Sequence, residues 1–111
     1  MEITIIDSYC NKLHPSQSYL VLDDGGISVV KPNEEVVWKV NKKLKISSIL
    51  IKDDKSINLF VPDPAPVKGD FKIWKGTVRG NLTAGEEENY RIYWSEEGVV
   101  YSYDPKIQVN N

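Results

Sequence analysis

Hydrophobic and polar residues alternate along this chain with the period of two that is typical of β-strands. In residues 35–40 the alternation places Val36, Trp38 and Val40 on one side of the segment and Glu35 and Lys39 on the other. No segment keeps hydrophobic residues at the spacing of an amphipathic helix. The pattern therefore predicts an all-β protein in which Trp38 points into the core.

Clusters of Gly, Pro, Asn and Asp divide the chain into short segments of this kind. The expected strands are residues 3–6, 19–22, 27–30, 35–40, 44–52, 57–61, 71–78, 89–94 and 99–103, with a closing strand that holds Ile107 and Val109. Segments 19–22 and 27–30 flank an Asp-Asp-Gly-Gly turn and are predicted to form a hairpin. Residues 62–66 are expected to form a loop because of their prolines, and Gly76 is expected to mark a bulge. Strands at this regular spacing are typical of a two-sheet sandwich.

Two segments resemble the cupredoxin family. Residues 29–40 read Val-Val-Lys-Pro-Asn-Glu-Glu-Val-Val-Trp-Lys-Val and resemble the strand–turn–strand with the pattern V-x-x-G-x-x-V-x-W that leads to the first copper-binding histidine. Residues 90–109 are similar to the cupredoxin ending, where an aromatic strand enters a ligand loop and a G-x-I-x-V strand leaves it. The segment Trp-Lys-Gly-Thr-Val at 74–78 also resembles a motif of short bacterial hypothetical proteins. The length of 111 residues predicts one domain, residues 1–111. The resemblance, which covers roughly residues 29–109, implies a two-sheet Greek-key sandwich of the cupredoxin-like or immunoglobulin-like kind.

The ligands of a copper site are missing from these segments. A blue-copper site needs two His, one Cys and a weak axial ligand such as Met. The chain has one His, one Cys and one Met, and residues 39–48 and 94–98, where the ligands should stand, contain none of them. We therefore expect no copper, no other metal centre and no cofactor.

Composition excludes some partners. The 14 Lys and Arg against 16 Asp and Glu give a net charge of −2, which gives no support for nucleic-acid binding. The single cysteine, Cys10, allows no intramolecular disulfide. No stretch is long and apolar enough to span a bilayer, and the N-terminus is unlike a signal peptide, so we expect a cytoplasmic protein with no membrane partner. A monomer or weak homo-oligomer is expected.

Cys10 and His14 lie four residues apart in the first loop. They could form a nucleophile–base pair or half of a metal site. A lone cysteine more often packs as a small hydrophobic residue, and we favour that interpretation. A small metal-binding protein using Cys10 and His14 stays an alternative.

Acidic clusters offer a second kind of chemistry. The pairs at 23–24 and 53–54 could bind calcium, but Asp is also favoured in turns, which explains both pairs. Residues 86–88 and 96–97 could supply the acid and base of a small hydrolase. Nothing in the sequence predicts the burial that would shift their pKa values, so an enzyme is the least favoured class.

Aromatic residues suggest a binding face. Alternation places Phe71 and Ile73 on one side of their strand and Trp74 on the other, with Lys72. Tyr93 likewise lies opposite the apolar side of its strand, beside Arg91. Trp74 and Tyr93, if both outside, would form an aromatic platform for a saccharide, a peptide or a partner protein, whereas large side chains can also simply fill gaps between sheets.

The sequence thus predicts a non-enzymatic binding or protein-interaction module without a metal centre. The candidate binding face is Lys72, Trp74, Arg91 and Tyr93. A structural subunit of a larger assembly, in which an edge strand completes a partner's sheet, stays an alternative.

Overall fold

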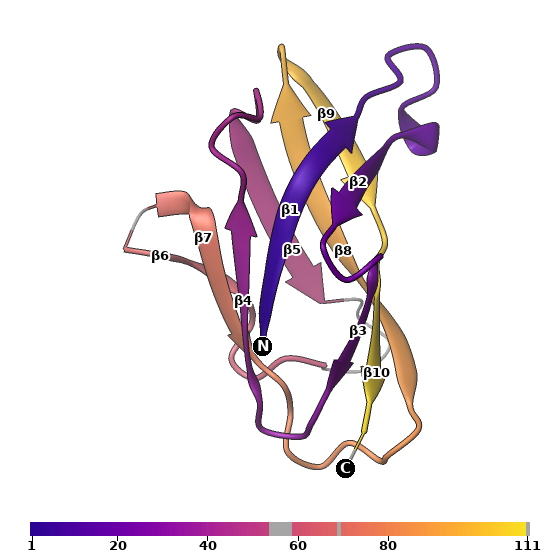
Figure 1. Cartoon of the computed structure of the whole chain (residues 1–111), viewed down its shortest axis with the longest axis vertical. Coiled ribbons are helices and arrows are strands. Elements are labelled where there is room, and N and C mark those ends of the chain that lie inside the picture. Colours follow the sequence, from indigo (N-terminus) through magenta and orange to yellow (C-terminus); the bar gives the residue numbers. More distant parts are fainter. Residues whose placement is uncertain (54–58, 69, 111) are drawn as a thin grey trace.

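The computed structural model of the chain describes residues 1–53, 59–68 and 70–110. Within these residues it contains β-strands and one 3-10 turn, η1 (Pro15–Gln17), and no α-helix (Figure 1). The strands are β1 (Glu2–Tyr9), β2 (Tyr19–Leu22), β3 (Ile27–Val30), β4 (Glu35–Val40), β5 (Ser48–Asp53), β6 (Ala65–Val67), β7 (Asp70–Thr77), β8 (Glu87–Glu96), β9 (Val99–Tyr103) and β10 (Lys106–Val109). None of the helical turns in the described ranges is long and apolar enough to cross a membrane.

The strands form two sheets that pack against each other, which confirms the predicted all-β sandwich (Figure 1). The first sheet has the order β2-β1-β4-β7-β6, and the second has the order β3-β10-β8-β5, with β9 also paired to β8. Both sheets are mixed, because β1 runs parallel to β4 and β3 runs parallel to β10. β9 and β10 both pair with the edge of β8 that lies opposite β5. β10 pairs with residues 87–89 of β8, and β9 pairs with residues 92–96.

The predicted hairpin between β2 and β3 is wrong. β2 pairs with β1 in the first sheet, whereas β3 pairs with β10 in the second. The turn between them carries the chain from one sheet to the other, and Leu22 and Val30 are both buried in the core between the sheets. Asp24 holds the turn by accepting hydrogen bonds from the backbone N–H of Gly26, at 2.9 Å, and from the Ser28 hydroxyl.

Aromatic side chains from both sheets meet in the core, as alternation predicted for Trp38, Tyr90 and Trp94. All three are at most 1% exposed. The Phe60 ring lies edge-on to Trp38 and to Tyr90, with ring centroids 5.4 and 6.0 Å apart. These rings fill the wide space between two twisted sheets, so they hold the sandwich together.

Several element boundaries differ from those predicted. β1 extends to Tyr9, and a bulge between Ile5 and Asp7 keeps it paired with β2. β5 begins only at Ser48, whereas the sequence predicted a start at residue 44. The sequence predicted a strand at residues 57–61, of which residues 57 and 58 lie outside the described part. In residues 59–61 the structure has a single bridge, between Phe60 and Val78.

Two predictions around Pro66 and Gly76 are also wrong. Part of the expected proline loop is the edge strand β6, where the missing N–H of Pro66 is tolerated because only one side of the strand is paired. Gly76 pairs in regular register with Val36 and makes no bulge. A β-carbon there would lie 3.3 Å from Phe60 Cδ1 and 3.4 Å from Trp38 Cζ3, so a larger residue fits only if these rings move by a few tenths of an ångström.

Candidate functional site

The four residues of the predicted binding face do not lie on one surface. Lys72 and Trp74 are on β7 in the first sheet, whereas Arg91 and Tyr93 are on β8 in the second. Trp74 is only 5% exposed, so its predicted outward orientation is wrong. It pairs in register with Trp38, packs in the core, and donates its indole N–H to the carbonyl oxygen of Phe71 at 2.8 Å. The inward side of β7 is thus the one that carries Trp74 and Gly76.

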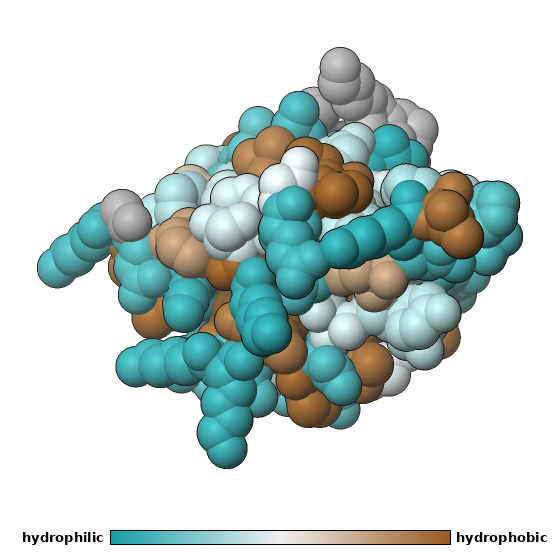
Figure 2. All heavy atoms as spheres, turned by 90° about the horizontal axis from the view of Figure 1, so that it is seen from above, coloured by the Kyte–Doolittle hydropathy of each residue, from teal (hydrophilic) through white to brown (hydrophobic). Residues whose placement is uncertain are grey.

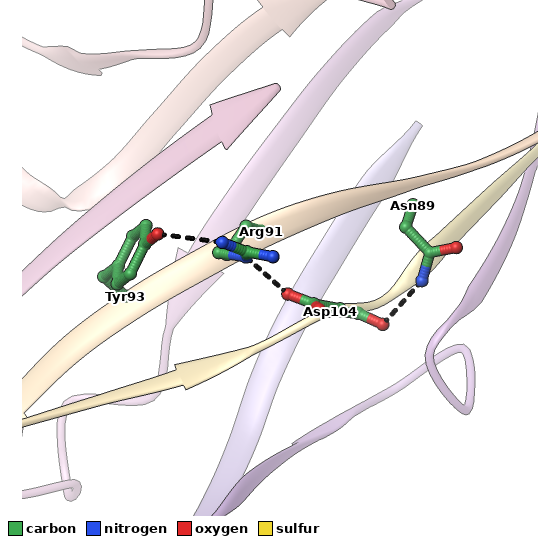
Figure 3. Close-up of polar contacts among 4 residues, drawn as sticks. All are labelled: Asn89, Arg91, Tyr93 and Asp104. Carbon is green, nitrogen blue, oxygen red and sulfur yellow. Dashed lines mark hydrogen bonds and ion pairs between the residues drawn. The ribbon is translucent and has the colours of Figure 1, made fainter. Parts of the chain in front are cut away.

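Arg91 and Tyr93 do lie together, on the outer surface of the second sheet (Figure 3). The Nε of Arg91 donates to Asp104 Oδ1 at 2.9 Å, and its Nη1 donates to the Tyr93 hydroxyl at 3.2 Å. Asn89 Nδ2 donates to the backbone oxygen of Asp104 at 3.2 Å. These contacts raise the pKa of the Arg91 guanidinium, the Tyr93 hydrogen bond first and the Asp104 contact second. The row of contacts fixes the direction in which the Tyr93 side chain points.

Beside Tyr93 the surface is hollowed into an open depression of about 470 Å³. The depression crosses three adjacent strands, and its lining residues are Ser48, Ile49, Leu50, Lys52, Tyr93, Trp94 and Val100. Leu50 is directly opposite Tyr93 in the strand register, and it is 41% exposed. Val100 on β9 is 64% exposed. We call this surface the β5–β8–β9 face.

The chemical type of the side chains on the β5–β8–β9 face changes along the direction of its strands. At one end, Ser48 and Ser95 are cross-strand partners whose hydroxyls lie 2.6 Å apart. At the other end Lys52 is the cross-strand partner of Arg91. Leu50 and its partner Tyr93 lie between these ends, whereas the exposed Val100 is the partner of Ser95 and lies at the serine end. A ligand on this face would therefore meet hydroxyls, then an apolar middle, then a cationic end.

Cys10 and His14 are not brought together by a hydrogen bond in the part of the chain that the structure describes. The Cys10 thiol donates to Glu96 Oε2, which also accepts from the Ser8 hydroxyl at 3.0 Å. Burial, and next the hydrogen bond to Glu96, raise the pKa of Cys10 to about 11, which keeps the thiol protonated near neutral pH. His14 lies exposed before η1. A protonated thiol is a poor nucleophile and a poor metal ligand.

A small pocket of about 140 Å³ lies beside Cys10. Its lining residues are Cys10, Lys12, Lys45, Glu96, Glu97 and Tyr101. Lys12 Nζ and Glu97 Oε2 form an ion pair at 2.6 Å, so the pocket's charges compensate one another in part. The sequence analysis considered Glu96 only as a possible acid or base and missed its contact with Cys10, because nothing in the sequence places β8 against the end of β1.

Metal-binding clusters are absent from the described residues, in which no three His, Cys, Asp or Glu side chains are placed to hold an ion. Asp23 Oδ1 accepts from the backbone N–H of Thr4 at 2.9 Å, and Asp53 Oδ2 accepts from that of Phe60 at 3.2 Å. Asp23 and Asp24 lie in the turn between β2 and β3, as the turn interpretation predicted, whereas Asp53 is the last residue of β5. Residue 54 lies outside the described part.

A second aromatic surface was missed by the sequence analysis. Tyr9 and Tyr19 are cross-strand partners on β1 and β2, and their rings stack at 5.0 Å between centroids. They are 50% and 46% exposed. Alternation in β2, which buries Leu20 and Leu22, could have placed Tyr19 outside. The pairing with Tyr9 could not have been found, because it depends on the register between two strands.

No protein-family model matches the chain, and no curated protein is similar to it at a significant level.

Proposed function

We propose that this protein is a non-enzymatic binding module that holds its ligand on the β5–β8–β9 face. The observation that carries the proposal is the depression around Tyr93, with Leu50 and Val100 exposed at its sides. Large apolar side chains gathered over a hollow are unfavourable in water, and they typically mark a site that a ligand or partner covers.

Two further features support a binding function. The Arg91–Asp104 and Arg91–Tyr93 contacts fix the Tyr93 side chain before any ligand arrives, which lowers the entropic cost of binding. The Cys10 thiol, the one candidate nucleophile we considered, has a raised pKa that disfavours catalysis. The proposed ligand classes are a peptide, a partner protein or a saccharide.

We also propose that the sandwich is a copper-free relative of the cupredoxin-like or immunoglobulin-like folds. In support, the two segments that resemble cupredoxins form β3–β4 and β8–β10, and β3 lies beside β10 in the same sheet. The proposal concerns ancestry only and adds no activity.

The test is a two-dimensional amide NMR titration of labelled protein with pools of short peptides, saccharides, nucleotides and divalent metals. We expect signals of Leu50, Tyr93 and Val100 to shift with a peptide or saccharide pool. Leu50→Ser should remove the response, whereas the matched change Val21→Ser, at an equally exposed valine on β2, should leave it intact. Shifts confined to Tyr9 and Tyr19, or to Cys10 with metal, would mean that the site has been misplaced.

A further inference from the structure

β5 is the terminal strand of its sheet and pairs, within the described residues, only with β8. In an antiparallel pair, alternate residues point their N–H and C=O groups away from the partner strand. The outer edge of β5 can therefore receive another strand. Four of the seven residues that line the depression, Ser48, Ile49, Leu50 and Lys52, belong to β5. A strand added at this edge would run alongside the depression.

Lysines are concentrated before β5 and within it, although the strand ends at Asp53 and Asp54 follows in the sequence. Residues 41–52 contain Lys42, Lys43, Lys45 and Lys52 and no acidic residue, although the whole chain has a net charge of −2. The first three precede β5, and Lys52 lies within it. All four are exposed, and the structure shows no ion pair to any of them in the ranges it describes. Figure 2 shows the end of the molecule that includes the β4–β5 connection, where long hydrophilic side chains project between smaller hydrophobic areas.

From this arrangement we infer that the ligand of the β5–β8–β9 face is an acidic peptide segment that pairs with β5 as an additional strand. The inference rests on the proposed binding function and names its ligand class. The peptide would present apolar side chains to Leu50, and carboxylates to Lys52 and to Lys42 and Lys43 before β5. Main-chain hydrogen bonds would supply affinity, and the charges would supply specificity and fast association.

The chemistry of the face fits an acidic peptide better than a saccharide or a nucleic acid. A neutral saccharide would leave Lys42, Lys43 and Lys52 without ion-pair partners in the described part of the chain. Single-stranded nucleic acids stack their bases on exposed aromatic rings, but the exposed large hydrophobic side chains here are the aliphatic Leu50 and Val100, and Tyr93 is half-buried. Arg91, the residue best suited to bind phosphate, already has Asp104 as its partner.

The probe is a short peptide that alternates glutamate and valine, compared with otherwise identical peptides that carry lysine or serine in place of glutamate. In titrations of the labelled full chain, we expect only the glutamate peptide to shift the β5 amides and the Leu50 methyl signals. Hydrogen exchange of alternate β5 amides should slow when it binds. Lys52→Glu should weaken binding roughly three- to tenfold, as expected for reversing a partly exposed charge. Lys75→Glu, which changes an exposed lysine on β7 in the other sheet, should leave affinity unchanged.

Several results would overturn the inference. Equal binding of the lysine peptide would exclude a preference for acidic ligands. Unchanged hydrogen exchange of the β5 amides would exclude the added strand. If saccharides alone shift Tyr93 and Leu50, the binding module stands but its ligand class is wrong. Tighter binding of single-stranded DNA, weakened by Lys52→Glu, would identify a nucleic-acid partner instead. If no probe moves the face, both proposals fail. Leu50→Ser, which removes an apolar contact and leaves the charges unchanged, serves as a second variant if Lys52→Glu perturbs the fold.

Discussion

The indole nitrogen of Trp38 lies 3.0 Å from the hydroxyl of Tyr90 and donates a hydrogen bond to it in the core. Trp38 is on β4 in the first sheet and Tyr90 is on β8 in the second, so the bond joins the two sheets. Both side chains are fully buried, and burial raises the pKa of Tyr90, which keeps its hydroxyl neutral.

Tyr90→Phe should therefore destabilise the fold while keeping the ring. The substitution leaves the buried Trp38 N–H without its acceptor, and an unsatisfied buried donor costs about 1–3 kcal/mol. Urea unfolding followed by tryptophan fluorescence measures this free energy. Tyr19→Phe, at an exposed tyrosine, is the control and should change it by less than about 0.5 kcal/mol. An unchanged unfolding free energy for Tyr90→Phe would mean that the hydrogen bond contributes nothing.

Alternation in the sequence predicted much of this core but failed at one strand. Glu35–Val40 has charged residues on one side only, so the buried side was clear and Trp38 was placed correctly. β7 has large hydrophobic residues on both sides, Phe71 and Ile73 against Trp74. Period two separates the two sides of such a strand but does not say which one faces inward. The small inward residue Gly76, which makes room for Trp38 and Phe60, is the feature that decides it.

Pairing between strands was less accessible to sequence reasoning than burial. The segments that form β2 and β3 were located correctly, yet their turn is equally compatible with a hairpin and with a crossing between sheets. The candidate site combined residues of β7 and β8, which belong to different sheets, because alternation says on which side of a strand a residue lies but not which strands are neighbours. The depression, by contrast, depends on the cross-strand register of Leu50 with Tyr93, which only the assembled sheet defines.

Gly76→Ala should be destabilising because of packing. The added methyl group would lie 3.2 Å from Pro64 Cγ and 3.3 Å from Phe60 Cδ1, closer than ordinary contacts. Overpacking of a core typically costs about 1–3 kcal/mol. Thermal or urea unfolding measures the loss, and Lys75→Ala on the exposed side of the same strand is the matched control. Equal stability of the two variants would show that this part of the core can expand at no cost.

Leu50→Ser should separate binding from stability. Leu50 is 41% exposed on an edge strand, so losing its side chain should change the unfolding free energy by less than about 1 kcal/mol. Binding of the glutamate–valine peptide should nevertheless weaken, because the apolar middle of the face is lost. Ile49→Ser, at the neighbouring buried position, should do the opposite and lower stability strongly. Unchanged peptide affinity in Leu50→Ser would remove the depression from the binding site.

The pH dependence of Cys10 tests the contact between β1 and β8. Its pKa is raised from 9.0 to about 11 by burial and by Glu96, so the fold favours the neutral thiol. The stabilisation from this thiol is complete below pH 9 and is lost as the pH rises towards about 11. The rate of alkylation by iodoacetamide, measured against pH, should therefore rise with an apparent pKa well above the ordinary value. The difference in unfolding free energy between the protein and Cys10→Ala should shrink over the same interval.

Glu96→Gln separates the two causes of that shift. The variant keeps the shape of the side chain but removes the negative charge that disfavours the thiolate, so the apparent pKa of Cys10 should fall and alkylation near pH 8 should become faster. Glu97→Gln is the matched control, because this exposed carboxylate is paired with Lys12 and makes no hydrogen bond to the thiol within the described contacts. An apparent pKa near 9 in the unmodified protein would show that the thiol is neither buried nor bonded to Glu96. Equal effects of the two variants would mean that general negative charge, and not the contact of Glu96 with the thiol, controls its ionisation.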